Sequence, residues 1–497
     1  MIKGFLARVN RNNKVYSPEQ LLKLKRKFAK KVCSTIYQKD NIIQFLSVQK
    51  NHKYGMPGDC ELTAEQIDLL NRFWEKYSFF GNIDYTDVQD CINRNGNFDV
   101  KYIPQYVFHR IIKPILVPDS FTLAYQNKAF LDVQLKGVKC PPTVLRGTQG
   151  IIYDSECNAI SQAQAIEICK SACEVNELVF KPSFSAGGRG ITFIGKDNTE
   201  IIEDTLTRMM KGTFIVQKVI EQHPEMAKLN ASGLNTIRVF TIRKNAEIIP
   251  LAAFLKVAAV GSRVDNFHAG STAIGVHMDG TITGWGINPG NEKVTVLPSG
   301  VKLGSDFTRI PCWSSVIETV KSAHYRMPNV MMTAWDVAVD SNNEAVIIEP
   351  NHAPDIRVHQ LLTGPLFGEH TEYILDYVLS KYSKTSSFGE YIICEYNDHV
   401  SIKGYIGDET EVVIPNKIKG KKVTALENYS FAFNNKLESI TLGKYVKKVN
   451  RGSFMGCCNL QALNGDINKI VFSNSYSEQF MGCDKLPADA VNAALGI

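Results

Sequence analysis

The end of this 497-residue chain repeats a short pattern of its own. The run from Val423 to Leu437 returns 23 residues later as Val446 to Leu460, with a Ser-Phe pair and a closing Leu at matching positions. A weaker third copy follows, with Phe480 and Leu486 offset by 26 residues. Repeats with a period in the twenties and one short strand per copy stack into a solenoid, because each copy buries its apolar face against the next.

Two of the copies carry Gly-Cys-x-x-Leu after their phenylalanine, at Gly456–Leu460 and Gly482–Leu486. This arrangement resembles the BspA-like leucine-rich repeats of bacterial surface proteins. The resemblance implies a small leucine-rich repeat module over 391–497, which would be either a platform for a protein or glycan partner or a packing cap. We find no catalytic cluster in it. The Ser/Thr/Lys-rich stretch before it predicts a linker at 383–390.

The composition is that of a globular protein, with 44% hydrophobic and 21% charged residues, and it excludes wholesale disorder. No apolar run approaches the roughly 18 residues that a membrane span needs, and the first residues lack the pattern of a secretory signal. The 12 cysteines are scattered without any Cys-x-x-Cys pair, as expected of reduced, buried thiols rather than a zinc site. We therefore expect a cytoplasmic protein of mixed α+β class.

Charge is concentrated at the start, where residues 1–53 hold 13 Lys and Arg against 2 Asp and Glu. Within 18–32, apolar residues from Leu21 to Val32 recur at helical spacing and the lysines fall largely off that stripe. The preferred interpretation is a docked helix with a solvated basic face. The alternative is a helix that binds an anionic membrane, peripheral to the inner face, or an acidic substrate. A nucleic-acid partner is not expected, since no aromatic-rich basic module follows.

Residues 1–99 are predicted to be mostly helical, with one helix at 64–77, and a mixture of helices and strands is predicted from residue 100 onward. One long helix is expected at 156–175 and another near 374–382. The apolar runs predict strands at 178–180, 191–194, 214–217, 236–243, 247–256, 333–339 and 345–349.

A glycine-rich loop lies between the first two of these strands, in Lys181-Pro-Ser-Phe-Ser-Ala-Gly-Gly-Arg-Gly190. Strand–loop–strand predicts a hairpin whose backbone N–H groups can fold over phosphate oxygens while Lys181 supplies a charge. An overlapping P-loop-like run is rejected, because its intervening residues are a strand and Asp197 stands where a magnesium-binding Ser or Thr is needed.

Two acids are predicted to face each other on neighbouring strands. A tight turn at Asn342-Asn343 would pair residues whose numbers sum to 685, which sets Asp336 opposite Glu349 and Asn351 on the same face. Opposed like charges are unfavourable unless a cation lies between them. Two carboxylates and an amide oxygen therefore predict a Mg²⁺ site that bridges nucleotide phosphates.

Further polar residues lie between these features. The apolar strand at 214–217 runs into polar residues, as in a hinge that grips adenine by its edge. Arg238 and Lys256 stand on successive predicted strands, and the polar loop 265–272 is expected to contact substrate. Its candidate residues are Asn266, His268, Gly270 and Ser271.

This order of motifs resembles the ATP-grasp superfamily over about 100–382, and in particular its sugar-transfer-associated branch. The resemblance implies the ATP-grasp fold, with parts at 100–177, 178–257 and 258–382. For ATP it implies contacts from Lys128, Lys181, Ser185, Gly187, Gly188, Gly190, Gln217, Lys218, Val219 and Ile220. For Mg²⁺ it implies Asp336, Glu349 and Asn351. Arg238 and Lys256 would be the catalytic cations near the transferred phosphate.

Two positions depart from the family pattern. Gln217 stands where many relatives carry an acid, and the ribose-binding acid is either Glu221 or Glu225. The resemblance implies a carboxylate–amine ligase that makes an acylphosphate, with a small carboxylate and an amine or sugar acceptor as partners. The expected product is an amide on a cell-surface polysaccharide precursor. The alternatives are an amino-acid ligase acting on a peptide or protein, and a non-catalytic nucleotide-binding protein that presents the repeats.

Overall fold

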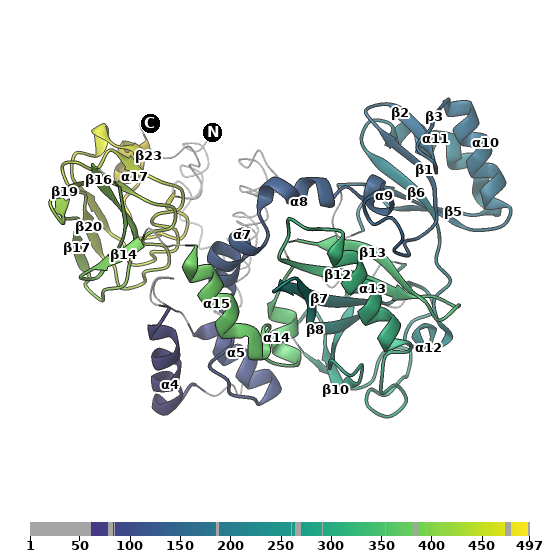
Figure 1. Cartoon of the computed structure of the whole chain (residues 1–497), viewed down its shortest axis with the longest axis horizontal. Helices are drawn as coiled ribbons and strands as arrows, with labels where there is room; N and C mark the ends of the chain where they lie inside the picture. The colour runs from purple at the N-terminus through teal and green to yellow at the C-terminus, as the bar shows by residue number, and fades with distance from the viewer. Residues whose placement is uncertain are drawn as a thin grey trace, which may run out of the picture. The chain divides into compact units, whose positions relative to one another are not determined.

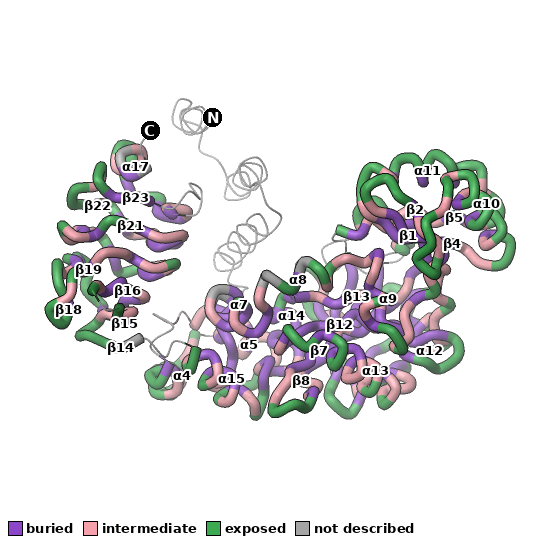
Figure 2. The backbone as a smooth tube through the Cα atoms, turned by 45° about the horizontal axis from the view of Figure 1, so that its top comes forward, coloured by how far each residue is buried: buried purple, intermediate pink, exposed green. Residues whose placement is uncertain are grey.

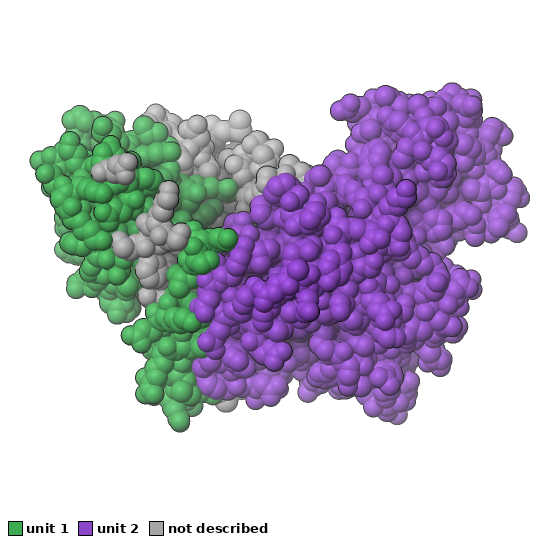
Figure 3. All heavy atoms as spheres, viewed as in Figure 1, with its two compact units in different colours: residues 1–86, 379–497 green, residues 87–378 purple. Residues whose placement is uncertain are grey.

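The computed structural model describes residues 61–77, 83, 85–184, 188–259, 261–263, 270–290, 292–352, 354–381, 385–396, 398–472 and 479–495. The chain divides into two compact units, one of residues 1–86 with 379–497 and one of residues 87–378 (Figure 3). No helix in the described part of the chain is long and apolar enough to cross a membrane. The basic stretch 18–32 lies outside the described residues.

The first sheet of residues 87–378 has six antiparallel strands in the order β3-β2-β1-β6-β4-β5 (Figure 1). Its strands are β1 Thr143–Thr148, β2 Ile151–Asp154, β3 Ala159–Ile160, β4 Leu178–Pro182, β5 Thr192–Ile194 and β6 Phe214–Lys218. Helices α10 (Gln162–Cys173) and α11 (Ile202–Met209) bury apolar side chains such as Cys169 and Leu206 against the sheet, which forms one core.

The second sheet has seven antiparallel strands in the order β11-β10-β9-β8-β7-β12-β13. Its strands are β7 Thr236–Lys244, β8 Glu247–Val257, β9 Thr272–Val276, β10 Ile282–Ile287, β11 Lys293–Val294, β12 Met332–Val339 and β13 Ala345–Asn351. Helix α13 (Trp313–Tyr325) packs on one face, where Val316 and Val320 join Ile237, Leu255 and Val337 in a single core. Because side chains alternate along a strand, the intervening residues of the same strands project to the other face.

The remaining helices are short. They are α5 Thr86–Asn95, α6 Gln105–Val107, α7 Lys113–Leu116, α8 Asp119–Tyr125, α9 Leu131–Gln134, α12 Pro224–Ala227, α14 Arg357–Leu362 and α15 Thr371–Ser380, with η2 Phe108–Ile112, η3 Lys128–Phe130, η4 Lys196–Ile201 and η6 Gly368–His370. In the other unit, α4 (Ala64–Glu75) confirms the helix predicted at 64–77, and Thr63 caps it with Gln66 in a capping box.

The C-terminal region is a β-solenoid of about three turns over 399–472 (Figure 1). Its strands are β14 Thr385–Phe388, β15 Tyr391–Glu395, β16 His399–Tyr405, β17 Glu411–Val413, β18 Lys417–Ile418, β19 Lys421–Leu426, β20 Ser439–Thr441, β21 Lys448–Val449, β22 Ala462–Asn464 and β23 Val471–Phe472; η7 Ile467–Lys469 and α17 Ala488–Leu495 complete it. Leu426, Val449 and Phe472 are successive parallel partners, so the structure confirms the 23-residue period. Tyr405, Phe431, Phe454 and Phe480 form a ladder with centroids 5.3, 6.0 and 5.8 Å apart.

Two predicted boundaries differ from the structure. The helix expected from residue 156 begins at Gln162, because the Asp154 carboxylate accepts backbone N–H bonds from Glu156 and Asn158 and closes a turn there. Part of the predicted linker is strand β14, paired with β15. The compact unit that holds both sheets spans residues 87–378, and within it the Asp87 carboxylate accepts the Gln105 N–H.

The solenoid cysteines behave as small buried hydrophobes. The Sγ atoms of Cys457 and Cys483 donate to the carbonyls of Phe431 and Phe454, at 2.9 Å each, and burial raises the pKa of Cys483 to about 12. Since the thiolate is the reactive form, we expect both to resist iodoacetamide at pH 8 until the chain unfolds, while exposed Cys157 reacts within minutes. Site-resolved mass spectrometry checks this, and early labelling of Cys457 would contradict it.

A buried histidine makes stability depend on pH. The Nε2 atom of His324 donates to the Val330 carbonyl (3.0 Å), so Nδ1 of the neutral ring accepts from Thr241 Oγ1 (2.8 Å). Thr241 Oγ1 in turn accepts from Trp335 Nε1 (2.9 Å). Burial lowers the pKa of His324 from 6.5 to about 4. Between those pH values the unfolded chain binds a proton that the folded chain does not, so this contribution is complete above pH 6.5 and falls by about 1.4 kcal/mol per pH unit below it.

We therefore expect His324→Gln to lessen the decline in unfolding free energy between pH 7 and pH 5, while His352 and His359, whose pKa values burial also lowers to about 4, sustain the rest of it. Urea titration followed by tryptophan fluorescence measures it, because Trp335 lies beside the site. His399→Gln in the solenoid is the control and should leave the slope as in the wild type. An unchanged slope in His324→Gln would contradict the assignment.

Candidate active site

Three charged residues occupy one row of the second sheet. Glu349 on β13, Asp336 on β12 and Arg238 on β7 are successive register partners, which confirms that Asp336 and Glu349 face each other. Partners in an antiparallel pair project to the same side. The row lies on the face opposite α13, because the neighbouring positions Ile237 and Val337 are buried in the core with that helix.

The hairpin that presents the two acids differs from the prediction at its turn. Asn343 adopts the left-handed conformation (φ 65°), and the strands next to the turn pair Val337 with Ile347, one residue out of the predicted register. A bulge at Ile348 restores the predicted pairing at the acids. The prediction was therefore right at the acids and wrong at the turn.

Asp336 is buried at the centre of a cationic cluster. Its Oδ1 accepts from Arg238 Nε and its Oδ2 from Arg238 Nη2, both at 2.8 Å, while Lys256 Nζ lies 2.9 Å from Oδ2. Asn351 Nδ2 also donates to Oδ2, at 3.2 Å. Burial alone would raise the pKa of Asp336, but Arg238 and Lys256 hold it well below its usual value. The carboxylate is therefore ionised throughout the neutral range.

Glu349 faces this cluster with a cation of its own. Lys128 Nζ, from η3, lies 3.0 Å from Glu349 Oε2, and both side chains are half-buried. The facing acids are thus neutralised by protein cations and do not by themselves require a metal ion. Two carboxylates with the Asn351 amide oxygen remain an oxygen donor set that suits Mg²⁺. Three cations and two acids give the site a net positive charge, which by itself repels a metal ion. Mg²⁺ would therefore suit this site only together with the negative charge of a phosphate group.

The polar groups of the predicted hinge on the first sheet already have hydrogen-bond partners within the protein. Gln217 is buried; its Oε1 accepts from Lys181 Nζ (3.1 Å) and its Nε2 donates to the Pro141 carbonyl (3.2 Å). The N–H groups of Lys218 and Val219 bond to the carbonyls of Pro142 and Glu177. Ile220 follows directly. Lys181 and Gln217, each predicted to contact ATP, are thus in direct contact with each other.

The glycine-rich loop joins two paired strands, as predicted, with Leu178 opposite Ile194. Gly188 and Gly190 have φ values of 72° and 77°, which only glycine adopts freely. A Cβ on Gly190 would also approach Pro182 Cγ to 3.0 Å. Ser185 and Gly187 lie outside the described residues.

A family model described as sugar-transfer associated ATP-grasp matches residues 116–373, just over half of the chain. The chain belongs to this ATP-grasp family. No curated protein matches it.

Solved structures share parts of the chain at low identity. The crystal structure of D-cycloserine synthetase DcsG is 11% identical over 54% of this chain and 73% of its own, with a TM-score of 0.34. The ATP-grasp ligase PsnB with a minimal precursor is 12% identical over 52% and 63%, with a TM-score of 0.32. The T. pallidum leucine-rich repeat protein TpLRR is 21% identical over 21% and 48%, with a TM-score of 0.19. The match spans less than two thirds of the latter two chains, and these scores assign no activity.

The remaining ATP-grasp positions are placed as follows. Ser271 is buried, and Gly270 beside it has a φ of 104°, whereas Asn266 and His268 lie outside the described residues. Both candidates for the ribose-binding acid have partners: Glu221 accepts from Ser341 Oγ (3.3 Å) and Glu225 from Lys228 Nζ (2.6 Å). The choice between them stays open.

Arg263 forms an ion pair with Glu177 that was not predicted from the sequence. It follows β8 in the second sheet, and its Nη1 and Nη2 reach the two carboxylate oxygens of Glu177 at 2.6 and 2.5 Å. Its guanidinium also lies 3.7 Å from the ring centroid of Phe193 on β5. The pair therefore ties the loop after β8 to the sheet that carries the glycine-rich hairpin of this ATP-grasp chain.

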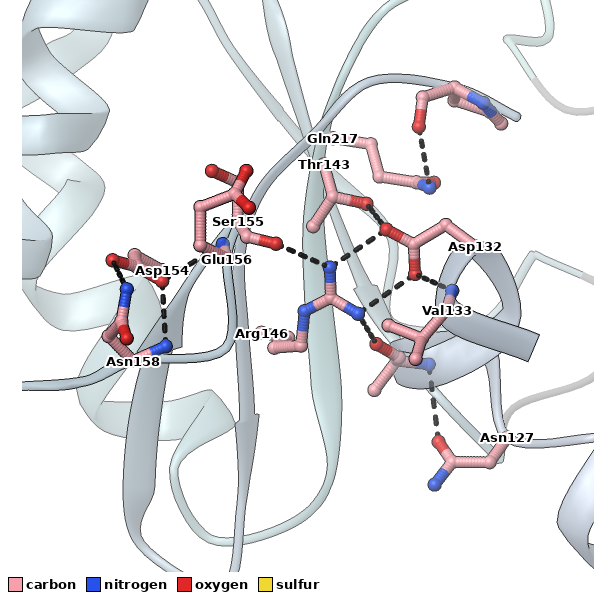
Figure 4. Close-up of polar contacts among 12 residues, drawn as sticks. Asn127, Asp132, Val133, Thr143, Arg146, Asp154, Ser155, Glu156, Asn158 and Gln217 are labelled. Atoms are coloured by element: carbon pink, nitrogen blue, oxygen red, sulfur yellow. Dashed lines mark hydrogen bonds and ion pairs between the residues drawn. The ribbon is translucent and has the colours of Figure 1, made fainter. Parts of the chain in front are cut away.

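A second missed feature is the buried ion pair that anchors η3 (Figure 4). Arg146 on β1 is fully buried, and its Nη1 and Nη2 each donate to one oxygen of Asp132 at 2.8 Å. Nη1 also donates to the Ala129 carbonyl (2.9 Å), and the Ala129 N–H bonds to Ser183 Oγ (3.0 Å). Because Ala129 follows Lys128, these bonds fix the segment that delivers that lysine to the ATP-grasp site. The only signal in the sequence was a lone arginine within an apolar strand.

Proposed function

We propose that this chain is an ATP- and Mg²⁺-dependent, ADP-forming carboxylate–amine ligase that works through an acylphosphate. One observation carries the proposal: the cationic cluster of Lys128, Arg238 and Lys256 surrounds two facing acids at the end of the second sheet. The three cations exceed the two acids by one positive charge. Because these side chains are largely buried, that positive charge suits the binding of a phosphate chain. Membership of the ATP-grasp family supports the same assignment.

In this proposal Asp336, Glu349 and Asn351 hold Mg²⁺, which supplies charge neutralisation at the phosphate oxygens. Gln217, Lys218, Val219 and Ile220 receive adenine at the hinge. The remaining nucleotide contacts come from Lys128, Lys181 and the loop residues Ser185, Gly187, Gly188 and Gly190, with Glu221 or Glu225 at the ribose. The proposed contacts to the substrate are Asn266, His268, Gly270 and Ser271.

The proposed reaction depends on positioning the reactants and neutralising their charge more than on proton transfer by side chains. The substrate carboxylate attacks the γ-phosphorus, the bond to the bridging oxygen of ADP breaks, and an acylphosphate forms. The amine then adds to the acyl carbon, loses a proton and expels phosphate. Arg238 and Lys256 stabilise charge on the transferred phosphoryl group, and the glycine-rich loop excludes the water that would hydrolyse the intermediate.

We further propose that the acceptor is an amino or uronic acid group on a cell-surface polysaccharide precursor. The family's association with sugar transfer supports this class of substrate. The test is ATP turnover to ADP and phosphate with candidate carboxylates and amino sugars. Stimulation by a pair of acid and amine supports the ligase. Stimulation by amino acids with peptides alone would favour the peptide ligase. AMP as the product would exclude the acylphosphate route, and nucleotide binding without stimulated turnover would favour a non-catalytic protein.

A further inference from the structure

The solenoid coils carry exposed stretches between their buried ones (Figure 2), and five of the exposed residues on neighbouring coils are lysines. We call them the lysine surface: Lys417, Lys422, Lys444, Lys447 and Lys448. Lys417 lies on β18 and Lys422 on β19, Lys444 and Lys447 precede β21, and Lys448 is the first residue of β21. Lys417 and Lys422 are direct register partners in the antiparallel β18–β19 pair, so their side chains project to the same side.

The side chains from two coils converge around one aromatic ring. Lys422 Nζ lies 5.0 Å and Lys444 Nζ 4.9 Å from the ring centroid of Tyr445. The Lys444 N–H bonds to Asn416 Oδ1 (2.8 Å), next to Lys417, and the Lys447 N–H bonds to the Thr424 carbonyl, close to Lys422 in β19. These backbone bonds therefore fix the spacing of the chain positions from which the lysine side chains project.

None of the five lysines has an acidic partner within the described ranges of the chain. Lysines elsewhere in the module do: Lys421 pairs with Glu395, Lys436 with Asp408 and Lys469 with Asp466. Residues 391–497 hold 12 Lys and Arg against 11 Asp and Glu, so the excess is local to this surface. Like charges that face each other on neighbouring strands destabilise a sheet, and the cation–π contacts with the single Tyr445 ring offset only part of this repulsion. An anionic ligand would relieve the rest.

We propose that the lysine surface binds an acidic polysaccharide through its carboxylates. Strands of adjacent coils lie about 4.8 Å apart, so a linear polymer that crosses the coils meets new ammonium groups at each step. Lysine is a point charge on a flexible stem, suited to single carboxylates along a flexible chain. Phosphate recognition in nucleic acids favours the bidentate arginine fork, and no member of the surface is arginine.

This inference deepens the proposed function, because it names the class of polymer that the ligase would hold while its acceptor end is modified. It rests on the glycan assignment made above. The two remain separable by experiment, since polymer binding needs neither ATP nor an intact nucleotide site.

The test measures binding of the full-length protein to polygalacturonate, with neutral dextran of similar length as the reference polymer. The test variant is Lys417→Gln/Lys422→Gln/Lys444→Gln. The matched control is Lys436→Gln/Lys469→Gln/Lys485→Gln, which removes three exposed lysines of the same module that have polar partners. Circular dichroism and thermal unfolding check that both variants fold.

We expect the wild type and the control to bind polygalacturonate in a salt-dependent way, and the test variant to bind at least tenfold more weakly. Equal binding by both triple variants would overturn the inference. So would equal binding to dextran, or tighter binding to a single-stranded oligonucleotide or to anionic phospholipid vesicles. Asp336→Asn should bind the polymer as the wild type does. Polymer binding without any ligase turnover would leave this inference standing and remove the proposed function.

Discussion

Replacing Asp336 with asparagine is expected to lower acceptor-stimulated ATP turnover about 10²–10³-fold. The carboxylate is the shared partner of Arg238 and Lys256 and a proposed Mg²⁺ ligand, so the amide removes the charge that orients both cations. Asparagine has the same shape and keeps one acceptor oxygen, which limits the structural change. Steady-state release of ADP, measured across ATP and Mg²⁺ concentrations, gives the effect on kcat and KM separately.

Asp340→Asn is the matched control for this variant. Asp340 belongs to the same hairpin and is buried, but its carboxylate pairs with Lys139 and closes the turn rather than facing the nucleotide site. We expect its turnover to stay within a few-fold of the wild type. Turnover of Asp336→Asn at the level of this control would show that the cationic cluster is not the catalytic centre.

Replacing Arg146 with alanine is expected to destabilise the first sheet by about 3 kcal/mol, because it leaves the Asp132 carboxylate and the Ala129 carbonyl without their buried partner. The bonds that fix η3 are lost with it, so the apparent KM for ATP should rise through Lys128 even where the chain remains folded. Hydrogen exchange in peptides that span 143–148 reports the local stability of β1, and ATP titration reports the KM.

Two further variants separate the effect of Arg146 on stability from its effect on the position of η3. Arg208→Ala removes an exposed arginine from α11 in the same subdomain and should change stability by less than about 0.5 kcal/mol. Asp132→Ala combined with Arg146→Ala should restore part of the lost stability, since neither charge is then left buried alone. The KM for ATP should stay raised in the double variant. A normal KM in Arg146→Ala would limit the ion pair to a role in stability.

Much of the fold was predictable because its strands are apolar runs that end at polar residues. The glycine-rich hairpin, the apolar hinge strand and the pairing of Asp336 with Glu349 follow from local patterns within some twenty residues. The turn register was wrong by one residue because a bulge at Ile348 has no sequence signature. The helix expected from residue 156 failed because the Asp154 side chain bonds to the backbone and closes a turn.

The partners of the site residues were not predictable for a different reason. Periodicity tells which face of a strand a residue occupies, but not which distant segment lies over that face. Lys128 reaches Glu349 across more than two hundred residues of chain, and Arg263 reaches Glu177 between the two sheets. For the same reason the ion pair of Arg146 was not predicted, because its partner Asp132 is on a helix too short to produce a periodic pattern.

The aromatic ladder of the solenoid has a consequence for how such a module changes length. Within the ladder each ring contacts the next ring along the stack, and the parallel partners advance by a fixed 23 residues between β19, β21 and β23. Duplicating one complete coil would add a rung and leave every existing contact in place, whereas deleting a single residue would shift the inward side chains of one rung outward. Gene duplication can therefore lengthen the module in whole steps without redesign of its core.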